Sequence, residues 1–133
     1  MLTRKERLDF IEIFYQFFYL KIVELVNPRF LSFTCKDAID TGEAVAVSFY
    51  VFLHLLSDPS SIKKAEKDFI LWMLYAPALL TRERAIDIQR FNRAISSLSL
   101  IHVEMESDHQ KIISSFSPLY KPNLFKKIII KES

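Results

Sequence analysis

Two histidines and one glutamate in the last third of the chain have the residue types and spacing of metal ligands. His102, Glu106 and His109 lie at i, i+4 and i+7, so a continuous helix would place them on one face. Imidazole and carboxylate groups bind Zn²⁺ and iron, but di-iron helical bundles use two Glu-x-x-His motifs and this chain has one. These residues are therefore interpreted either as a solvated polar patch or, as an alternative hypothesis, as the site of a metal-binding helical enzyme or sensor.

Nucleophilic catalysis has little support in the sequence. Cys35 is the single cysteine, and its pairing with a histidine is the only nucleophile–base arrangement of interest. The chain has no Gly-x-Ser-x-Gly, no phosphate-binding Gly-x-x-x-x-Gly-Lys, no Cys-x-x-Cys and no His-Glu-x-x-His motif. We assign no catalytic residue and no cofactor, and we expect a non-enzymatic protein in which Cys35 is a small, partly buried side chain.

The scarcity of glycine indicates the fold class. The 133 residues include one glycine, Gly42, and twelve phenylalanines. Glycine supplies the positive φ angles of tight hairpins, so a sheet with short turns is disfavoured. Half of the residues are apolar, enough for the core of one domain of this length. The sequence predicts a single all-α domain over residues 1–133, a compact bundle of four to five helices with a basic C-terminal tail.

Capping residues and prolines predict where the helices begin and end. Thr3 and Glu6 form a capping box, and Asp58 followed by Pro59 is typical of a helix start. Pro77 is expected to end the third helix, and Thr81 to cap the fourth. Gly42 would lie inside the second helix, which Thr34 and Asp37 are expected to cap. The predicted helices cover residues 4–26, 35–57, 59–76 and 82–110, and the tail covers residues 117–133.

The first predicted helix has more apolar surface than a surface helix needs. At 100° per residue, Lys5, Asp9, Glu12 and Gln16 form one narrow polar stripe, and apolar residues cover about 180° of the rest. Such a helix is either central to the bundle or buried on two sides, once by its own domain and once by another chain. The residues that we expect to contact a partner are Phe10, Phe14, Tyr15, Phe17, Phe18 and Ile22.

The charge distribution bears on possible partners. The net charge is +2, but residues 109–133 carry five lysines and one acidic residue. Lys126, Lys127 and Lys131 are candidates for contacts with phosphates, anionic lipid or an acidic protein, so peripheral membrane attachment through the tail is a second alternative. Nucleic acid is not an expected partner, because the arginines of the predicted fourth helix alternate with acidic residues.

No segment has the pattern of a signal peptide or a membrane span. Acidic residues interrupt the apolar stretch near the N-terminus, and the longest apolar run, Ala44 to Leu56, is shorter than the roughly 20 residues that a span requires. We expect a cytoplasmic protein. The main hypothesis is a protein–protein interaction module of the adaptor, chaperone or inhibitor (immunity) type, which forms a homodimer through its aromatic first helix.

Overall fold

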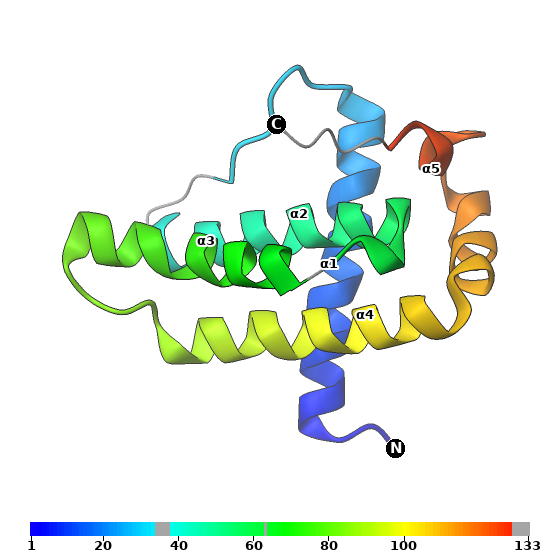
Figure 1. The fold of residues 1–133 in the computed structure, drawn as a ribbon. Coiled ribbons are helices and arrows are strands. Elements are labelled where there is room, and N and C mark those ends of the chain that lie inside the picture. Colours follow the sequence, from blue (N-terminus) through cyan, green and yellow to red (C-terminus); the bar gives the residue numbers. More distant parts are fainter. Residues whose placement is uncertain (34–37, 63, 129–133) are drawn as a thin grey trace.

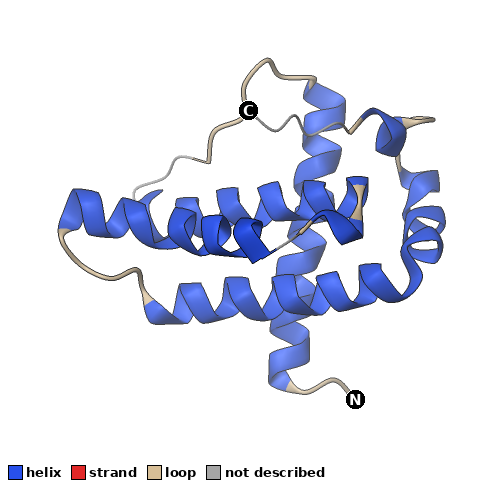
Figure 2. Cartoon of the chain, in the orientation of Figure 1, coloured by secondary structure: helices blue, strands red, loops and turns tan. Residues whose placement is uncertain are grey.

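The computed structural model describes residues 1–33, 38–62 and 64–128, and these residues form helices and connecting segments without a strand (Figures 1 and 2). The all-α prediction is confirmed. The helices are α1 (Arg4–Val26), α2 (Glu43–Ser57), α3 (Lys64–Arg82), α4 (Ile88–Phe116) and α5 (Leu124–Lys127).

Helices α2, α3 and α4 lie side by side, and α1 crosses them at a steep angle (Figure 1). Helix α2 is at the centre, because it packs against both α3 and α4, while α1 packs mainly on α4 and to a smaller extent on α2. The most deeply buried large side chains are Phe52 and Leu55 of α2, Leu74 of α3 and Met105 of α4. The core therefore lies between the three side-by-side helices, and α1 covers one side of it.

The ends of α1 follow from local sequence. The Thr3 hydroxyl accepts a hydrogen bond from the Glu6 amide and the Glu6 carboxylate accepts one from the Thr3 amide, which completes the predicted capping box. At the other end Asn27 adopts the left-handed conformation (φ 47°), and Pro28 follows. Asparagine tolerates this conformation better than most residues, so α1 has the bounds that the sequence predicts.

The segment before α2 is a π-helical turn, Ala38–Gly42, rather than part of a regular helix. Gly42 lies at the start of α2 and not within it. The Asp40 carboxylate in this turn accepts two hydrogen bonds from the Arg84 guanidinium, at 3.0 and 2.6 Å, and one from the Asp87 amide, at 3.1 Å. The Arg84 hydrogen bonds hold the pKa of Asp40 below its usual value. The turn is thereby fixed to the α3–α4 connection. The predicted caps Thr34 and Asp37 lie outside the described residues.

The predicted third helix, residues 59–76, is wrong at both ends. Asp58 caps a short 3₁₀ turn, Pro59–Ser61, and α3 begins only at Lys64. Helix α3 then continues through Pro77 to Arg82. Proline removes one backbone hydrogen bond, but Ala76 and Ala78 on either side of it are buried in the fold. The packing of these two alanines in the core outweighs the tendency of Pro77 to end the helix.

The fourth helix begins later and ends later than residues 82–110. Thr81 is not its cap; it lies in the last turn of α3, where its hydroxyl donates to the Pro77 carbonyl. Asp87 is the cap, and its carboxylate accepts the Arg90 amide at 3.0 Å. Near its end α4 bends at Asp108 (φ −152°, ψ 61°), where the Asp108 carboxylate accepts the Lys111 amide at 3.2 Å. This internal cap starts a second helical segment that reaches Phe116 (Figure 1).

The described part of the C-terminal tail packs on α1. The Tyr120 hydroxyl donates to the Phe17 carbonyl at 2.7 Å, and burial raises the pKa of Tyr120 to about 12. The Lys21 ammonium donates to the Leu119 carbonyl at 2.8 Å and to the Glu24 carboxylate at 2.5 Å. Glu24 is buried and also accepts the Lys121 amide. These contacts join the chain after α4 to the second half of α1.

One helical stretch, Ile39–Ser57, is long and apolar enough to cross a membrane by length and composition. It is longer than the run considered in the sequence, because the π-helical turn extends it. More than half of this stretch is buried inside the fold, and the core helix of a globular protein passes the same test.

The Glu24 contacts predict how stability depends on pH. Hydrogen bonds from the Lys21 ammonium and the Lys121 amide lower the pKa of Glu24 below its ordinary value of about 4.5. Its contribution to the free energy of unfolding is therefore complete above the ordinary pKa and is lost as the pH falls through the lowered, folded-state pKa. We expect Glu24→Gln to lose stability at neutral pH and to show a flatter acid dependence than the unmodified protein.

Urea unfolding at several pH values between neutrality and strong acid measures this effect. The matched control is Glu104→Gln, because Glu104 is exposed on α4 and forms no ion pair within the described residues. Equal acid dependence of Glu24→Gln and Glu104→Gln would show that the Glu24 contacts do not stabilise the fold.

Candidate functional site

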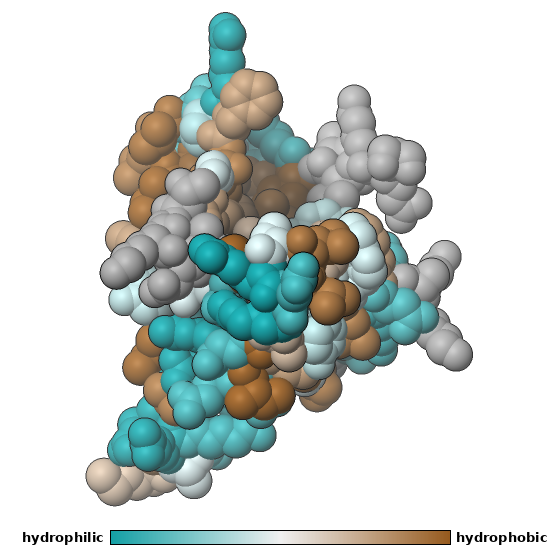
Figure 3. Space-filling model, turned by 90° about the vertical axis from the view of Figure 1, so that its left-hand side faces the viewer, coloured by the Kyte–Doolittle hydropathy of each residue, from teal (hydrophilic) through white to brown (hydrophobic). Residues whose placement is uncertain are grey.

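One face of α1 presents large apolar side chains to solvent along the whole helix. Phe10, Phe14 and Phe18 are 61%, 55% and 48% exposed. Figure 3 shows one side of the molecule, on which apolar residues reach the surface in several groups beside hydrophilic ones. We call the exposed apolar set of α1 the aromatic face; its members are Phe10, Ile11, Phe14, Tyr15, Phe18, Ile22, Leu25 and Val26.

The rings of the aromatic face contact one another. Phe10 stacks on Phe14 with 6.4 Å between the ring centroids, and Tyr15 lies edge-on to Phe14 and Phe18 at 6.3 and 6.4 Å. Tyr15 also stacks on Tyr19 at 6.0 Å. Aromatic pairs at these separations attract each other beyond their buried area. The rings of the aromatic face therefore support one another within a single chain.

A groove of about 270 Å³ lies beside the aromatic face, between α1 and the segment that follows α4. Phe14 and Phe18 form one wall, and the buried rings of Phe17 and Tyr120 lie deeper. Lys21 lies at its edge, over the Tyr120 ring at 5.4 Å. The groove has the dimensions and lining to accept an apolar side chain from another molecule. Its residues are Phe14, Phe17, Phe18, Lys21, Phe116, Leu119 and Tyr120.

The structure separates Phe17 from the other five predicted partner residues. Phe14, Phe18, Phe10, Tyr15 and Ile22 are exposed, whereas Phe17 is 7% exposed. Its ring stacks on Phe116 at 3.8 Å and meets Phe52 edge-on at 4.8 Å. An apolar arc of about 180° does not show which of its edges faces the core, so the sequence pattern could not make this distinction.

Most of the polar stripe of α1 faces inward, beside its buried apolar residues, whereas an ordinary amphipathic helix turns its polar residues to solvent. Asp9 and Gln16 are both 5% exposed. The Asp9 carboxylate accepts the Ser96 hydroxyl of α4 at 3.1 Å, and Glu12 lies 3.6 Å from the Arg93 guanidinium. Within the chain α1 is thus buried on one side only, and that side is mixed, because Phe17 and Leu20 are buried on it as well. Of the two arrangements expected for this helix, a central position in the bundle is not the one observed.

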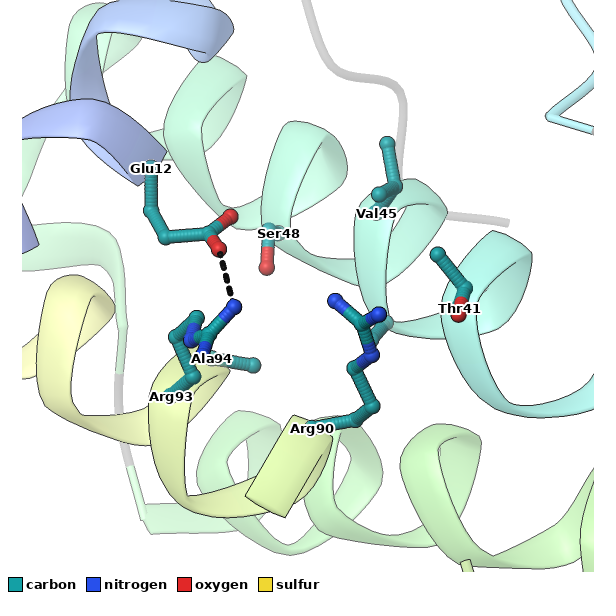
Figure 4. A pocket seen from close by; sticks show the side chains of 8 residues that line it. Glu12, Thr41, Val45, Ser48, Arg90, Arg93 and Ala94 are labelled. Carbon is teal, nitrogen blue, oxygen red and sulfur yellow. Dashed lines mark ion pairs between the residues drawn. The ribbon is translucent and has the colours of Figure 1, made fainter. Parts of the chain in front are cut away.

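A small polar cavity opens where α1 meets α2 and α4. We call it the arginine pocket, and its enclosed space is about 30 Å³. Figure 4 shows the Glu12 carboxylate, the Ser48 hydroxyl and the guanidinium groups of Arg90 and Arg93 turned toward this space, with Thr41 of the π-helical turn at its far end. Three small apolar residues, Ala44, Val45 and Ala94, complete the lining.

The three metal candidates do not come together. His102 and Glu106 do share a helix face, with Nε2 and Oε1 3.3 Å apart. His109 follows the bend at Asp108, and its Nε2 lies 3.2 Å from the Leu56 carbonyl, at the end of α2. Within the described residues no three His, Cys, Asp or Glu side chains are grouped as a metal site. Cys35 lies outside the described residues.

Two of the three lysines predicted to make tail contacts lie within the described residues. Lys126 and Lys127 are exposed on α5, and Lys131 lies outside the described residues.

Comparisons with known proteins add no functional information. No protein family matches the chain, and no curated protein or solved structure matches it. The functional argument therefore rests on the geometry of the chain itself.

The separation of Phe14 from Phe17 gives a stability prediction. Phe17→Ala removes a buried ring and should lower the free energy of unfolding by about 3–5 kcal/mol. Phe14→Ala removes a ring that is more than half exposed and should change it by less than about 1 kcal/mol in dilute solution. Urea unfolding at low protein concentration measures both. Equal losses for the two variants would mean that the aromatic face is part of the core.

Proposed function

We propose that this protein is a non-enzymatic protein–protein interaction module that self-associates through α1. The observation that carries the proposal is the outward orientation of the aromatic face together with the inward orientation of the polar side of the same helix. Contiguous exposed apolar patches of this kind mark interaction surfaces in soluble proteins. Aromatic residues are also the side chains that contribute most to interface affinity.

The size of the aromatic face supports a stable partner. Eight large side chains that are between two fifths and two thirds exposed leave on the order of 800 Å² open to solvent. A standard interface buries about 800 Å² on each partner. The face of one helix is therefore large enough for a complete dimer interface.

Shape supports a second copy of the chain as the partner. In a two-fold dimer each surface contacts its own equivalent, so a ring that projects from one copy needs a groove on the other. Phe14 and Phe18 project from α1 and also border the 270 Å³ groove beside it. One copy thus supplies both the apolar anchor and the groove that receives it.

Charge supports an antiparallel pairing of the two α1 helices. The first turns of α1 carry three exposed basic residues, Arg4, Lys5 and Arg7, against one acidic residue, Glu6, and its last turn carries no basic residue. The C-terminal end of a helix has a partial negative charge. Antiparallel pairing places the basic end of each copy near the negative end of the other.

Helix α3 has a second exposed apolar cluster, which includes Phe69, Trp72 and Leu80. Phe69 stacks on Trp72 with 6.0 Å between their centroids. The aromatic face is the better self-association surface because it extends along α1 from Phe10 to Val26 and adjoins its own groove. The α3 cluster remains available to a different protein, as an adaptor, chaperone or inhibitor would require.

Self-association is tested with Phe14→Glu, which places a charge at the centre of the aromatic face. We expect the unmodified protein to sediment as a dimer at micromolar concentration and Phe14→Glu to sediment as a monomer, because an interface does not tolerate an unpaired buried charge. Sedimentation equilibrium measures both, and circular dichroism checks that the variant is folded.

Trp72→Glu is the matched control, since it makes the same kind of change on an exposed ring of α3. It should remain a dimer. A monomeric unmodified protein would contradict self-association, and a dimer that Trp72→Glu disrupts while Phe14→Glu does not would move the interface to α3.

A further inference from the structure

We propose that the arginine pocket is a binding site for a small carboxylate anion. This site is separate from the aromatic face, because it opens on the polar side of α1. The ligand class follows from the donors that the pocket presents, the net charge of its lining and its size.

Two guanidinium groups supply the positive charge. Arg90 and Arg93 lie three residues apart on α4, and both side chains point toward the pocket (Figure 4). The Arg90 guanidinium has no hydrogen bond or ion pair within the described part of the chain, and Arg93 has one ion pair, the 3.6 Å contact with Glu12. Guanidinium groups bind carboxylates through paired hydrogen bonds, so most of this donor capacity is open to a ligand.

A buried hydroxyl points into the same space. Ser48 of α2 is 6% exposed, and among the described residues its hydroxyl has no hydrogen-bond partner. Figure 4 shows this hydroxyl directed toward the space between the two guanidinium groups. The hydroxyl is therefore free to donate a hydrogen bond to an oxyanion that enters the pocket.

The frame around the pocket holds these donors in place. The Asp40 carboxylate ties the π-helical turn, which carries Thr41, to Arg84 and to the Asp87 amide. Asp87 in turn caps α4 at the Arg90 amide. The backbone on both sides of the pocket is therefore fixed before a ligand arrives, which reduces the entropic cost of binding.

Charge and size favour a carboxylate over a phosphate. Arg90 and Arg93 contribute two positive charges and Glu12 one negative charge, so the lining has a net charge of +1, which matches a monoanion. The cavity volume of about 30 Å³ exceeds the roughly 10–15 Å³ that one bound water requires, so it can hold the head of a carboxylate. A dianion such as phosphate would leave one negative charge unmatched by this lining.

The test is a titration with sodium acetate followed by ¹H–¹⁵N NMR, against sodium chloride at equal ionic strength. We expect saturable shifts of the Thr41 and Ser48 amides and of the Arg90 and Arg93 side-chain Nε–H signals with acetate and none with chloride. Sodium phosphate should bind less tightly than acetate.

Three variants assign the binding to the pocket. Arg90→Gln should weaken acetate binding about tenfold, the loss expected for one charge-assisted contact, and Ser48→Ala should weaken it by a smaller factor. Glu12→Gln should tighten it, because the internal carboxylate no longer competes for Arg93 and the net charge rises. The matched control, Arg82→Gln, removes an exposed arginine at the end of α3 and should leave the affinity unchanged.

The tighter binding of Glu12→Gln is a result that loss of structure would not produce. Acetate shifts that do not saturate, or that are equal in Arg90→Gln and Arg82→Gln, would overturn the site. Tighter binding of phosphate than of acetate would overturn the ligand class. Phe14→Glu should bind acetate as the unmodified protein does, so failure of the self-association proposal and failure of this one give different results.

Discussion

The packing of one side of α1 against α4 and the segment after it determines which of its residues reach solvent. Asp9 meets Ser96, Glu12 meets Arg93, and Glu24 receives the Lys21 ammonium and the amide that follows Tyr120. Because the two sides of a helix point in opposite directions, turning the side with Asp9 and Glu12 inward turns the aromatic face outward. The exposure of the aromatic face is thus a direct consequence of which side of α1 packs inward, where Phe17 and Leu20 join the core beside these polar contacts.

The same orientation creates the arginine pocket. A small space remains where this side of α1 meets α2 and α4. Glu12 reaches across such a space to Arg93, and Arg90 approaches it from one turn earlier on α4. The aromatic face and the arginine pocket therefore lie on opposite sides of α1, and both depend on how α1 is oriented against α4.

Local signals in the sequence were sufficient for α1 and insufficient elsewhere. Thr3, Glu6 and Asn27-Pro28 mark the ends of α1 because caps and breakers act over a few residues. Pro77 gives an equally clear local signal, yet α3 continues because Ala76 and Ala78 are buried. The bend at Asp108 could not be predicted either, and it is what separates His109 from His102 and Glu106.

The candidate site shows a similar limit. Periodicity identified the apolar arc of α1, and five of its six named residues are exposed, but the position of Phe17 at the inward edge depends on Phe116 and Phe52, which are far away in sequence. The arginine pocket joins residues from α1, the π-helical turn, α2 and α4. No spacing along the chain relates Glu12 to Ser48 or Arg90, so only the folded arrangement reveals them as neighbours.

The inward contacts of α1 also connect its two sides energetically. Phe17 and Leu20 join the core, and Ile13, Tyr19 and Val23 pack partly against it. The hydrogen bonds and ion pairs between α1 and α4 are worth about 1 kcal/mol or less each. Apolar burial contributes more per side chain, about 1.5–3 kcal/mol when complete, and the side chains of the aromatic face contribute little of it within one chain. If a second copy covers the aromatic face, α1 becomes packed on both sides. Self-association then supplies the apolar packing that one chain does not provide for this face of its first helix.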